Sequence, residues 1–327
     1  MTFDHCGSIG EPTWSQLPSS ILSVNAHNNI MDAQAPFDNP KADVILRSSD
    51  NVDFRVFRLL LSLASPIFND MFAMPQASEK INDNNQEMKD GLPIIQLAED
   101  SQTLSKLLIT CYPRYAGDAP ELETLEDLQA FLEVATKYEM DEAAGKYARE
   151  ELVAPRFLEG EAVRVFSIAH RWNLTKEIRI AARATLRNPM PAPFVEELEY
   201  ISAAAYHRLW TYHRKCAEVA EATLSSLPLM LFTMASRFIW SQCSGCHWWA
   251  TFRTRISAAL RDKPCGATVL DQGVIDAALR EANKCSTCRG PAEHDLREFA
   301  EMWANDVDAV TSKVIFGCFP SPLFADI

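Results

Sequence analysis

Several features are missing from this sequence of 327 residues, and each absence narrows the classes of protein to consider. No uninterrupted apolar run approaches the roughly 20 residues that a membrane-spanning helix needs. The N-terminus, from Met1 to Cys6, has neither the basic start nor the apolar block of a secretory signal peptide. We therefore expect a soluble intracellular protein, cytoplasmic or nuclear, that does not enter a membrane.

Short motifs that identify common enzyme classes are also absent. The sequence contains no Walker loop, no G-x-G-x-x-G, no H-E-x-x-H and no G-x-S-x-G. Acidic residues are plentiful, but no pair stands in a context that suggests general acid–base catalysis. No repeat of 20–50 residues is visible, which argues against a solenoid. We expect a protein that is not an enzyme.

Positive charge is scarce in one half of the chain. Residues 1–150 hold 11 Lys and Arg against 24 Asp and Glu, whereas residues 151–327 hold 20 of each kind, so the whole net charge of −13 lies in the first half. An acidic surface repels phosphate backbones. We therefore expect no nucleic acid partner for this half and favour a protein partner that brings positive charge.

The stretch from Ala42 to Phe72 changes its hydrophobic period part-way along. Residues Val44 to Val56 alternate between apolar and mostly polar, as half-buried strands do, and residues 48–51 favour a turn. From Phe57 the spacing becomes helical, with Phe57, Leu60, Leu61 and Ala64 on one face. Ser65 and Pro66 end that helix and start another, with Ser65 as the cap and Pro66 at the first helical position. The sequence thus predicts a hairpin, a helix, a Ser-Pro step and a second helix.

This order of elements resembles the core of a BTB/POZ domain, and more narrowly the BTB proteins common in fungi. Later segments extend the resemblance to about residue 150, and the residues that carry it are Asp43, Phe54, Leu59–Leu61, Leu63–Phe68, Met71–Phe72, Ile94–Leu97, Thr103–Tyr112, Phe131–Ala135, Lys137–Tyr138 and Met140. The resemblance implies an α+β fold, in which a small sheet is flanked by helices, over residues 41–153.

The resemblance also implies functions and is incomplete in two places. Members of this family self-associate, act as substrate adaptors for cullin-based ubiquitin ligases, or oligomerise transcription regulators. Animal members usually carry a histidine where this chain has Phe57, so the Asp–His polar pair of the family is absent. That departure and the polar insertion at residues 73–92 count against a cullin contact.

Three further regions flank this domain. Residues 1–40 sustain no hydrophobic period and read as a disordered arm. Residues 156–188 show helical spacing, like the helical extension of BTB adaptor proteins. Three prolines at 189, 191 and 193 mark a joint. Residues 194–327 read as an all-helical C-terminal domain whose first helix runs from Phe194 to about Ser226 and is interrupted by Pro228.

One helix of the extension carries a basic stripe. Lys176, Arg179, Arg183 and Arg187 are three, four and four residues apart, so they share one face. This stripe is either a solvated helix face or a surface that docks an acidic partner, including the acidic half of the chain itself.

The C-terminal domain also contains two C-x-x-C pairs, Cys243/Cys246 and Cys285/Cys288. Together they could supply the four thiolates of a tetrahedral structural Zn²⁺ site, with His247 and Cys265 as spare ligands. The 38 residues between the pairs require a helical hairpin to bring them together. The alternative is reduced cysteines packed among helices.

Two other chemistries use the same spacing. Cys243-x-x-Cys246-His247 spells the attachment motif of c-type haem, but no export route is visible. Thioredoxin-like redox chemistry needs a strand–turn–helix setting, whereas the surroundings read as helical. We therefore favour a protein–protein interaction module or scaffold. The alternative is a zinc-stabilised transcription regulator that binds nucleic acid through its C-terminal half.

Overall fold

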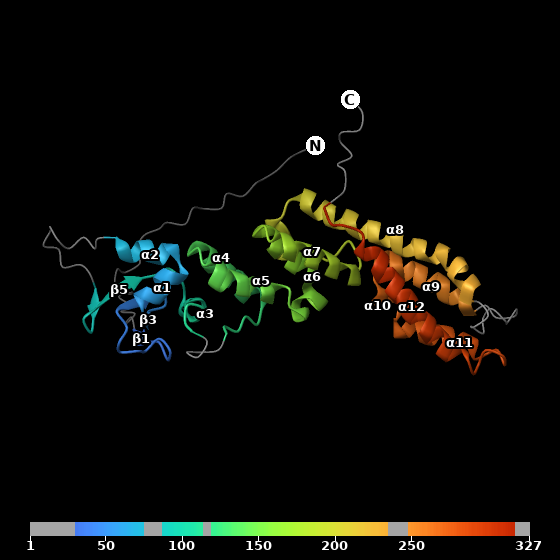
Figure 1. The fold of residues 1–327 in the computed structure, drawn as a ribbon, viewed down its shortest axis with the longest axis horizontal. Coiled ribbons are helices and arrows are strands. Elements are labelled where there is room, and N and C mark those ends of the chain that lie inside the picture. Colours follow the sequence, from blue (N-terminus) through green and yellow to red (C-terminus); the bar gives the residue numbers. More distant parts are fainter. Residues whose placement is uncertain (1–29, 75–86, 114–118, 235–247, 318–327) are drawn as a thin grey trace, which may run out of the picture. The chain divides into compact units, whose positions relative to one another are not determined.

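The computed structural model describes residues 30–74, 87–113, 119–234 and 248–317, without the side chains of 225–234 (Figure 1). The described chain divides into two compact units. The first unit contains the strands and consists of the described residues up to Val56 and of Glu87–Ser101. The second contains helices from Phe57 to Met74 and from Gln102 onward.

The first unit is a five-stranded sheet in the order β1-β3-β2-β5-β4. Its strands are β1 (Met31–Asp32), β2 (Val44–Arg47), β3 (Val52–Val56), β4 (Met88–Lys89) and β5 (Leu92–Gln96). Strand β2 pairs antiparallel with β3 and parallel with β5. All four residues of β2 are buried, and Phe54 on β3 contacts Phe37 edge to face at 5.5 Å.

The predicted hairpin is confirmed, and its turn has the polar residues expected. Val44 lies opposite Val56, and the turn closes where the Ser48 amide donates to the Val52 carbonyl over 3.0 Å. The Ser48 hydroxyl accepts the Val52 amide at 2.9 Å, and Asn51 adopts a φ of 64°. Asparagine tolerates this left-handed conformation better than most residues.

The predicted arm of residues 1–40 is wrong at its C-terminal end. Residues 1–29 lie outside the described part, but β1 pairs with β3 and Phe37 is buried. Backbone pairing with a neighbouring strand fixes this segment although its own sequence shows no hydrophobic period.

The second unit begins with short helices that the sequence places well. They are α1 (Arg58–Ala64), α2 (Pro66–Ala73), α3 (Ser101–Ile109), α4 (Leu125–Lys137), the π-helical turn η2 (Asp141–Gly145) and α5 (Lys146–Leu152). Ser65 caps α2 by accepting the Phe68 amide at 3.1 Å, with Pro66 at the first helical position. Thr124 caps α4 in the same way.

The extension is a helical hairpin followed by irregular chain. Its elements are α6 (Pro155–Arg171), α7 (Thr175–Ala184) and two 3₁₀ turns, η3 (Thr185–Arg187) and η4 (Glu196–Tyr200). Helices α6 and α7 pack against each other. Buried residues such as Phe166 and Ile168 line α6, and Ala181 and Ala182 line α7, where small side chains allow close approach.

The C-terminal helices share one apolar core. They are α8 (Ala203–Met234), α9 (Trp248–Asp262), α10 (Gly266–Val269), α11 (Gln272–Ala282) and α12 (Ala292–Ser312). Trp303 of α12 is buried and donates its indole N–H to the Thr223 hydroxyl of α8 over 2.8 Å. At Gly266 a side-chain Cβ would lie 2.5 Å from the Ala304 carbonyl, so only glycine allows α10 to lie this close to α12.

The long helix of this region differs from the prediction at both ends. Residues before Ala203 form η4 and irregular chain, and α8 continues past Pro228 to Met234. A proline removes one backbone hydrogen bond and strains the preceding turn, but a helix held by tertiary packing can continue through it. No helix among the described residues is long and apolar enough to span a bilayer.

Candidate functional site

The Ser65–Pro66 step is a fixed junction within the helical unit. The Ser65 hydroxyl is fully buried and donates to the Tyr138 carbonyl over 2.5 Å, while the same oxygen accepts the Phe68 amide. The Phe68 and Tyr138 rings stack at 4.4 Å with an interplanar angle of 4°. The residue types that mark the helix break therefore also attach α2 to the end of α4.

Helix α1 presents an apolar face to solvent. Leu59 and Leu63 are 68% and 77% exposed, and they lie four residues apart, so both point from the same side of the helix. Leu61 is buried on the opposite side. Large exposed apolar side chains that adjoin one another are a common mark of an interaction surface.

Sequence reasoning identified the buried face of α1 but not this exposed one. The predicted face consists of Phe57, Leu60, Leu61 and Ala64 and accounts for one side of the helix. It does not include Leu59 and Leu63. Two leucines outside the buried face of a seven-residue helix were the available signal. Single exposed leucines are common on protein surfaces, but two that adjoin on one helix face favour an interaction surface.

The sheet contains a buried ion cluster that the sequence analysis missed. Asp53 of β3 is fully buried and accepts two hydrogen bonds from Arg47 of β2, from Nε at 2.6 Å and from Nη2 at 3.1 Å. Lys89 Nζ lies 2.8 Å from the second Asp53 oxygen and 2.6 Å from Asp32. Arg47 also pairs with Glu87.

Opposite charges compensate one another in this cluster. Burial by itself would raise the pKa of Asp53, but the hydrogen bonds from Arg47 and Lys89 outweigh it and hold that pKa below its usual value. Because Arg47 and Asp53 lie directly opposite in the β2–β3 register, a predicted hairpin register would have paired them. The cluster fixes strand pairing and offers no free group for chemistry.

A second charged cluster lies in the extension. Arg164 of α6 donates to Glu197 of η4 over 2.8 Å and to Glu126 of α4 over 2.6 Å, and it also pairs with Glu161. The hydrogen bond from Arg164 is the largest influence that lowers the pKa of Glu126. One guanidinium with three carboxylates thus connects α4, α6 and the chain after the proline-rich joint.

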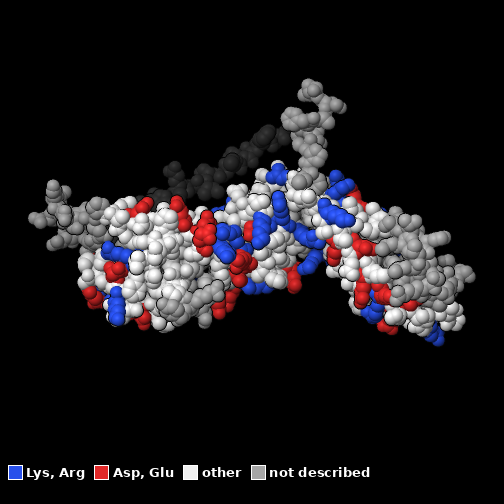
Figure 2. Space-filling model, viewed as in Figure 1, with Lys and Arg blue, Asp and Glu red and all other residues white. Residues whose placement is uncertain are grey.

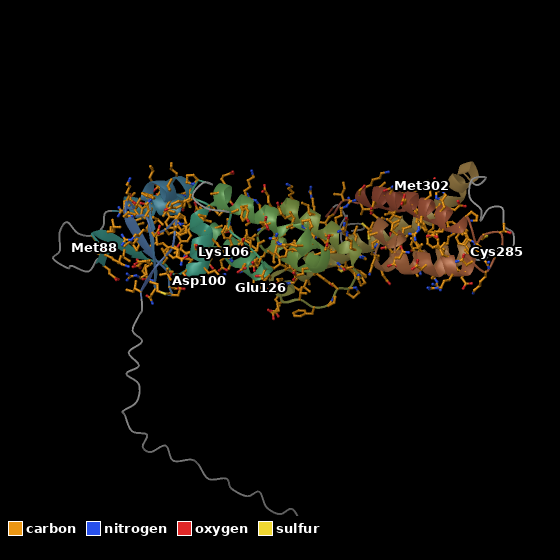
Figure 3. The ribbon with its side chains drawn as sticks, turned by 90° about the horizontal axis from the view of Figure 1, so that it is seen from below. Met88, Asp100, Lys106, Glu126, Cys285 and Met302 are labelled. Carbon is orange, nitrogen blue, oxygen red and sulfur yellow. The ribbon has the colours of Figure 1, made fainter. Side chains whose placement is uncertain are left out.

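Only half of the predicted zinc ligands fall within the described residues. Cys243, Cys246 and His247 lie outside them. Cys288 is fully buried in the core of the C-terminal helices, and Cys285 is half-buried against that core. Figure 3 shows Cys285 at the far end of these helices, with Met302 further along α12. Cys265, directly before α10, is also buried, and its sulfur lies 3.4 Å from the Thr268 hydroxyl.

The two helical segments that the zinc prediction expects to form a hairpin are both described. Helices α9 and α11 pack together and contribute side chains from Trp248 to Leu260 and from Ile275 to Ala282 to one core. Cys288 belongs to the same core as Trp248, which follows Cys246 by two residues in the sequence. Within the described part of the chain, no group of three or more His, Cys, Asp and Glu residues is placed to hold a metal ion.

A cavity of about 680 Å³ lies between α8 and α9. Its charged groups compensate one another: the Glu221 carboxylate accepts from Ser257 at 3.1 Å and from Arg261 at 2.6 Å. Arg261 therefore neutralises the carboxylate that contacts the Ser257 hydroxyl.

The basic stripe is exposed, but Arg187 lies in the 3₁₀ turn η3 and not, as the sequence predicts, on the same helix as the other three residues. Lys176, Arg179, Arg183 and Arg187 are all exposed, and Figure 2 shows Lys and Arg side chains gathered over the region of α6 to α8. Glu177, the single acidic residue of α7, is buried.

Comparison with protein families identifies the first part of the chain. The model of the BTB/POZ domain matches residues 35–151, which include the β2–β3 hairpin, the Ser65–Pro66 step and helices α3 to α5. No curated protein matches the sequence. The predicted fold class, a BTB/POZ domain with a small sheet flanked by helices followed by a mostly helical region, is confirmed, and a domain of this family is a protein–protein interaction module. Residues 35–151 of this chain are therefore a BTB/POZ domain.

Proposed function

We propose that this protein acts by binding rather than by catalysis, and that its BTB/POZ domain pairs with a second copy of itself through the exposed face of α1. The supporting observation is the exposure of Leu59 and Leu63 on one side of that helix. BTB/POZ domains mediate protein–protein contacts and dimerisation, so a second copy is the natural occupant.

Symmetry favours this choice of occupant. In a two-fold interface each copy contributes the same patch, so four leucines meet. Fully burying one leucine side chain contributes about 1.5–3 kcal/mol. Two leucines per copy therefore supply a useful part of a dimer interface, and neighbouring residues must supply the rest.

The test is the change Leu59→Glu with Leu63→Glu. Glutamate forms helices nearly as well as leucine, so α1 should persist while its apolar face is lost. Sedimentation equilibrium over a range of concentrations should show a dimer for the wild type and a monomer for this variant. The matched control is Phe194→Glu with Leu270→Glu, which changes two exposed apolar residues outside the domain and should leave the dimer intact. A monomeric wild type, or a variant that still dimerises, would refute the proposal.

An adaptor role for a cullin-based ubiquitin ligase is the finer form of this proposal. Membership of the BTB/POZ family supports it, whereas Phe57 in place of the usual histidine counts against it. The polar insertion lies mostly outside the described residues. Binding of the full chain to a purified cullin N-terminal region would test the role, and its absence would leave a scaffold without a ligase.

We also propose that the two C-x-x-C pairs hold a structural Zn²⁺ in the C-terminal domain. The α9–α11 hairpin supports this, because it relates the segment that contains Cys285 and Cys288 to the helix that begins just after Cys246. Such a site would stabilise the domain. The alternative of a regulator that binds nucleic acid through this domain requires salt-dependent DNA binding, which an affinity titration would measure.

A further inference from the structure

The basic stripe consists of the exposed side chains of Lys176, Arg179 and Arg183 on α7 and of Arg187 in the turn η3 that follows it. None of the four has an ion pair within the described residues, whereas Arg164 contacts three carboxylates. The segment 155–188 holds seven Lys and Arg against three Glu, a net charge of +4. This surplus stands out in a chain whose net charge is −13.

Buried neighbours fix the stripe in place. Glu177, the acidic residue that could have neutralised it, is buried, and the small residues Ala181 and Ala182 hold α7 close to α6. The positive charge of Arg183 acts on the buried Tyr212 and Cys216 of α8, which places this cation beside α8. Like charges three or four residues apart repel one another on a helix. The fold therefore holds four like charges close together, and their mutual repulsion lowers its stability.

A further cation adjoins the same helical hairpin. The exposed guanidinium of Arg171, at the end of α6, lies 4.7 Å from the ring centre of Trp172 and 4.5 Å from that of Tyr200. Stacking on both rings restricts this side chain, so it is presented in one arrangement. It extends the positive surface toward η4.

We propose that the basic stripe binds an acidic segment of a protein partner other than this chain. Three of its four cations are arginines, whose planar forks bind carboxylates with two hydrogen bonds. The stripe spans 12 residues, and the 11 steps from Lys176 to Arg187 correspond to about 16 Å at 1.5 Å per residue, which matches three turns of an acidic helix. A protein segment with a few carboxylates fits better than nucleic acid, because a long polyanion is also repelled by the acidic half of the chain.

The stripe and the α1 face are independent surfaces. The stripe begins at Lys176, 25 residues after the matched BTB/POZ domain ends at residue 151, so neither its binding nor the dimer requires the other. The Leu59→Glu with Leu63→Glu variant should keep the acidic partner, and charge reversal on α7 should leave the dimer unchanged. Failure of one proposal is thereby distinguishable from failure of the other.

The experiment uses the full chain and three fluorescent probes. They are a helical peptide with four Glu at spacings of three, four and four, the same peptide with Gln at those positions, and a duplex DNA. Anisotropy at stepped salt should show binding of the Glu peptide, weakened by salt, and no binding of the Gln peptide. Arg179→Glu with Arg183→Glu should weaken the Glu peptide at least ten-fold.

The matched control is Arg255→Glu with Arg280→Glu. It makes the same charge change at two exposed arginines of α9 and α11, and it should leave the affinity within two-fold. An equal loss in both double variants would overturn the proposal, because net charge alone would then explain binding. Tighter binding of DNA than of the Glu peptide would overturn the proposal by identifying nucleic acid as the occupant. Salt-sensitive assembly of the chain into species larger than the dimer would overturn it as well, if the α7 variant abolished those larger species, because the occupant would then be another copy of the chain.

Discussion

The side chains of Phe68 and Tyr138, 70 positions apart in the sequence, stack almost parallel at 4.4 Å, and both are buried. Between them the Ser65 hydroxyl donates to the carbonyl of Tyr138. These three residues thus connect the helical pair α1 and α2, which carries the exposed α1 face, to the end of α4. The orientation of that face depends on this junction.

Removing the stack should destabilise the domain strongly. Phe68→Ala should lower the free energy of unfolding by about 3–5 kcal/mol, because the side chain is fully buried and leaves a cavity. In a double-mutant cycle, Phe68→Leu and Tyr138→Leu should show a coupling of about 0.5–1.5 kcal/mol beyond the loss of area. Urea denaturation measures both. Additive effects of the two leucine variants would contradict a specific ring–ring interaction.

The buried carboxylate of Asp53 should be the most costly charge to remove. Asp53→Asn leaves Arg47 buried without its main partner, and we expect a loss of about 3–5 kcal/mol. The control Asp90→Asn removes an exposed partner of Arg55 and should change stability by less than about 1 kcal/mol. Equal effects would show that the buried cluster contributes no more than a surface pair.

Acid should destabilise the protein in part by protonating Asp53. The pKa of Asp53 is lower in the folded than in the unfolded chain, so its contribution to stability is complete above the unfolded value and is lost as pH falls through the folded value. We expect the stability difference between wild type and Asp53→Asn to shrink as pH falls below about 4. Urea midpoints from pH 7 to pH 3 measure it, and a constant difference would contradict the assignment.

Buried His213 should make stability depend on pH in the neutral range. Burial is the largest influence on its pKa and lowers it, although the contact with the Asn188 carbonyl, 3.1 Å from Nε2, acts the other way. A histidine with a lowered pKa binds its proton more readily when unfolded, so it destabilises the fold as pH drops below about 6.5. His213→Gln should remove that part of the decline between pH 7 and pH 5. An unchanged pH profile would refute this.

Local signals were sufficient to predict some elements from the sequence. The β2–β3 hairpin follows from a two-residue period with polar turn residues, and α2 follows from Ser65 before Pro66. Thr124 likewise identified the start of α4. In each case the deciding residues are within a few positions of one another, so one stretch of chain contains all the information.

Other features depend on partners that are remote in the sequence. Arg47 and Glu87 are 40 residues apart, and Thr223 and Trp303 are 80 apart. Residue type alone does not indicate which distant group will satisfy a buried guanidinium or indole. Helix α8 also continues through Pro228, where the local sequence signal predicts an interruption. The exposed leucines of α1 were visible in the sequence, but their role depends on which face the fold buries.

Zinc content provides the last prediction, and Cys285 is the better of the two described candidate cysteines to change. Cys288 is fully buried in the core, so replacing it would alter packing whether or not metal is bound, whereas Cys285 is half-buried. We expect about one Zn²⁺ per wild-type chain by elemental analysis and loss of most of it in Cys285→Ser. A chelator should lower the melting temperature of the wild type but not that of the variant, because the site would couple metal binding to folding. The control Cys111→Ser, in the turn after α3, should keep both the metal and the response to chelator. Equal metal content in wild type and Cys285→Ser would leave the cysteines as reduced thiols packed among helices.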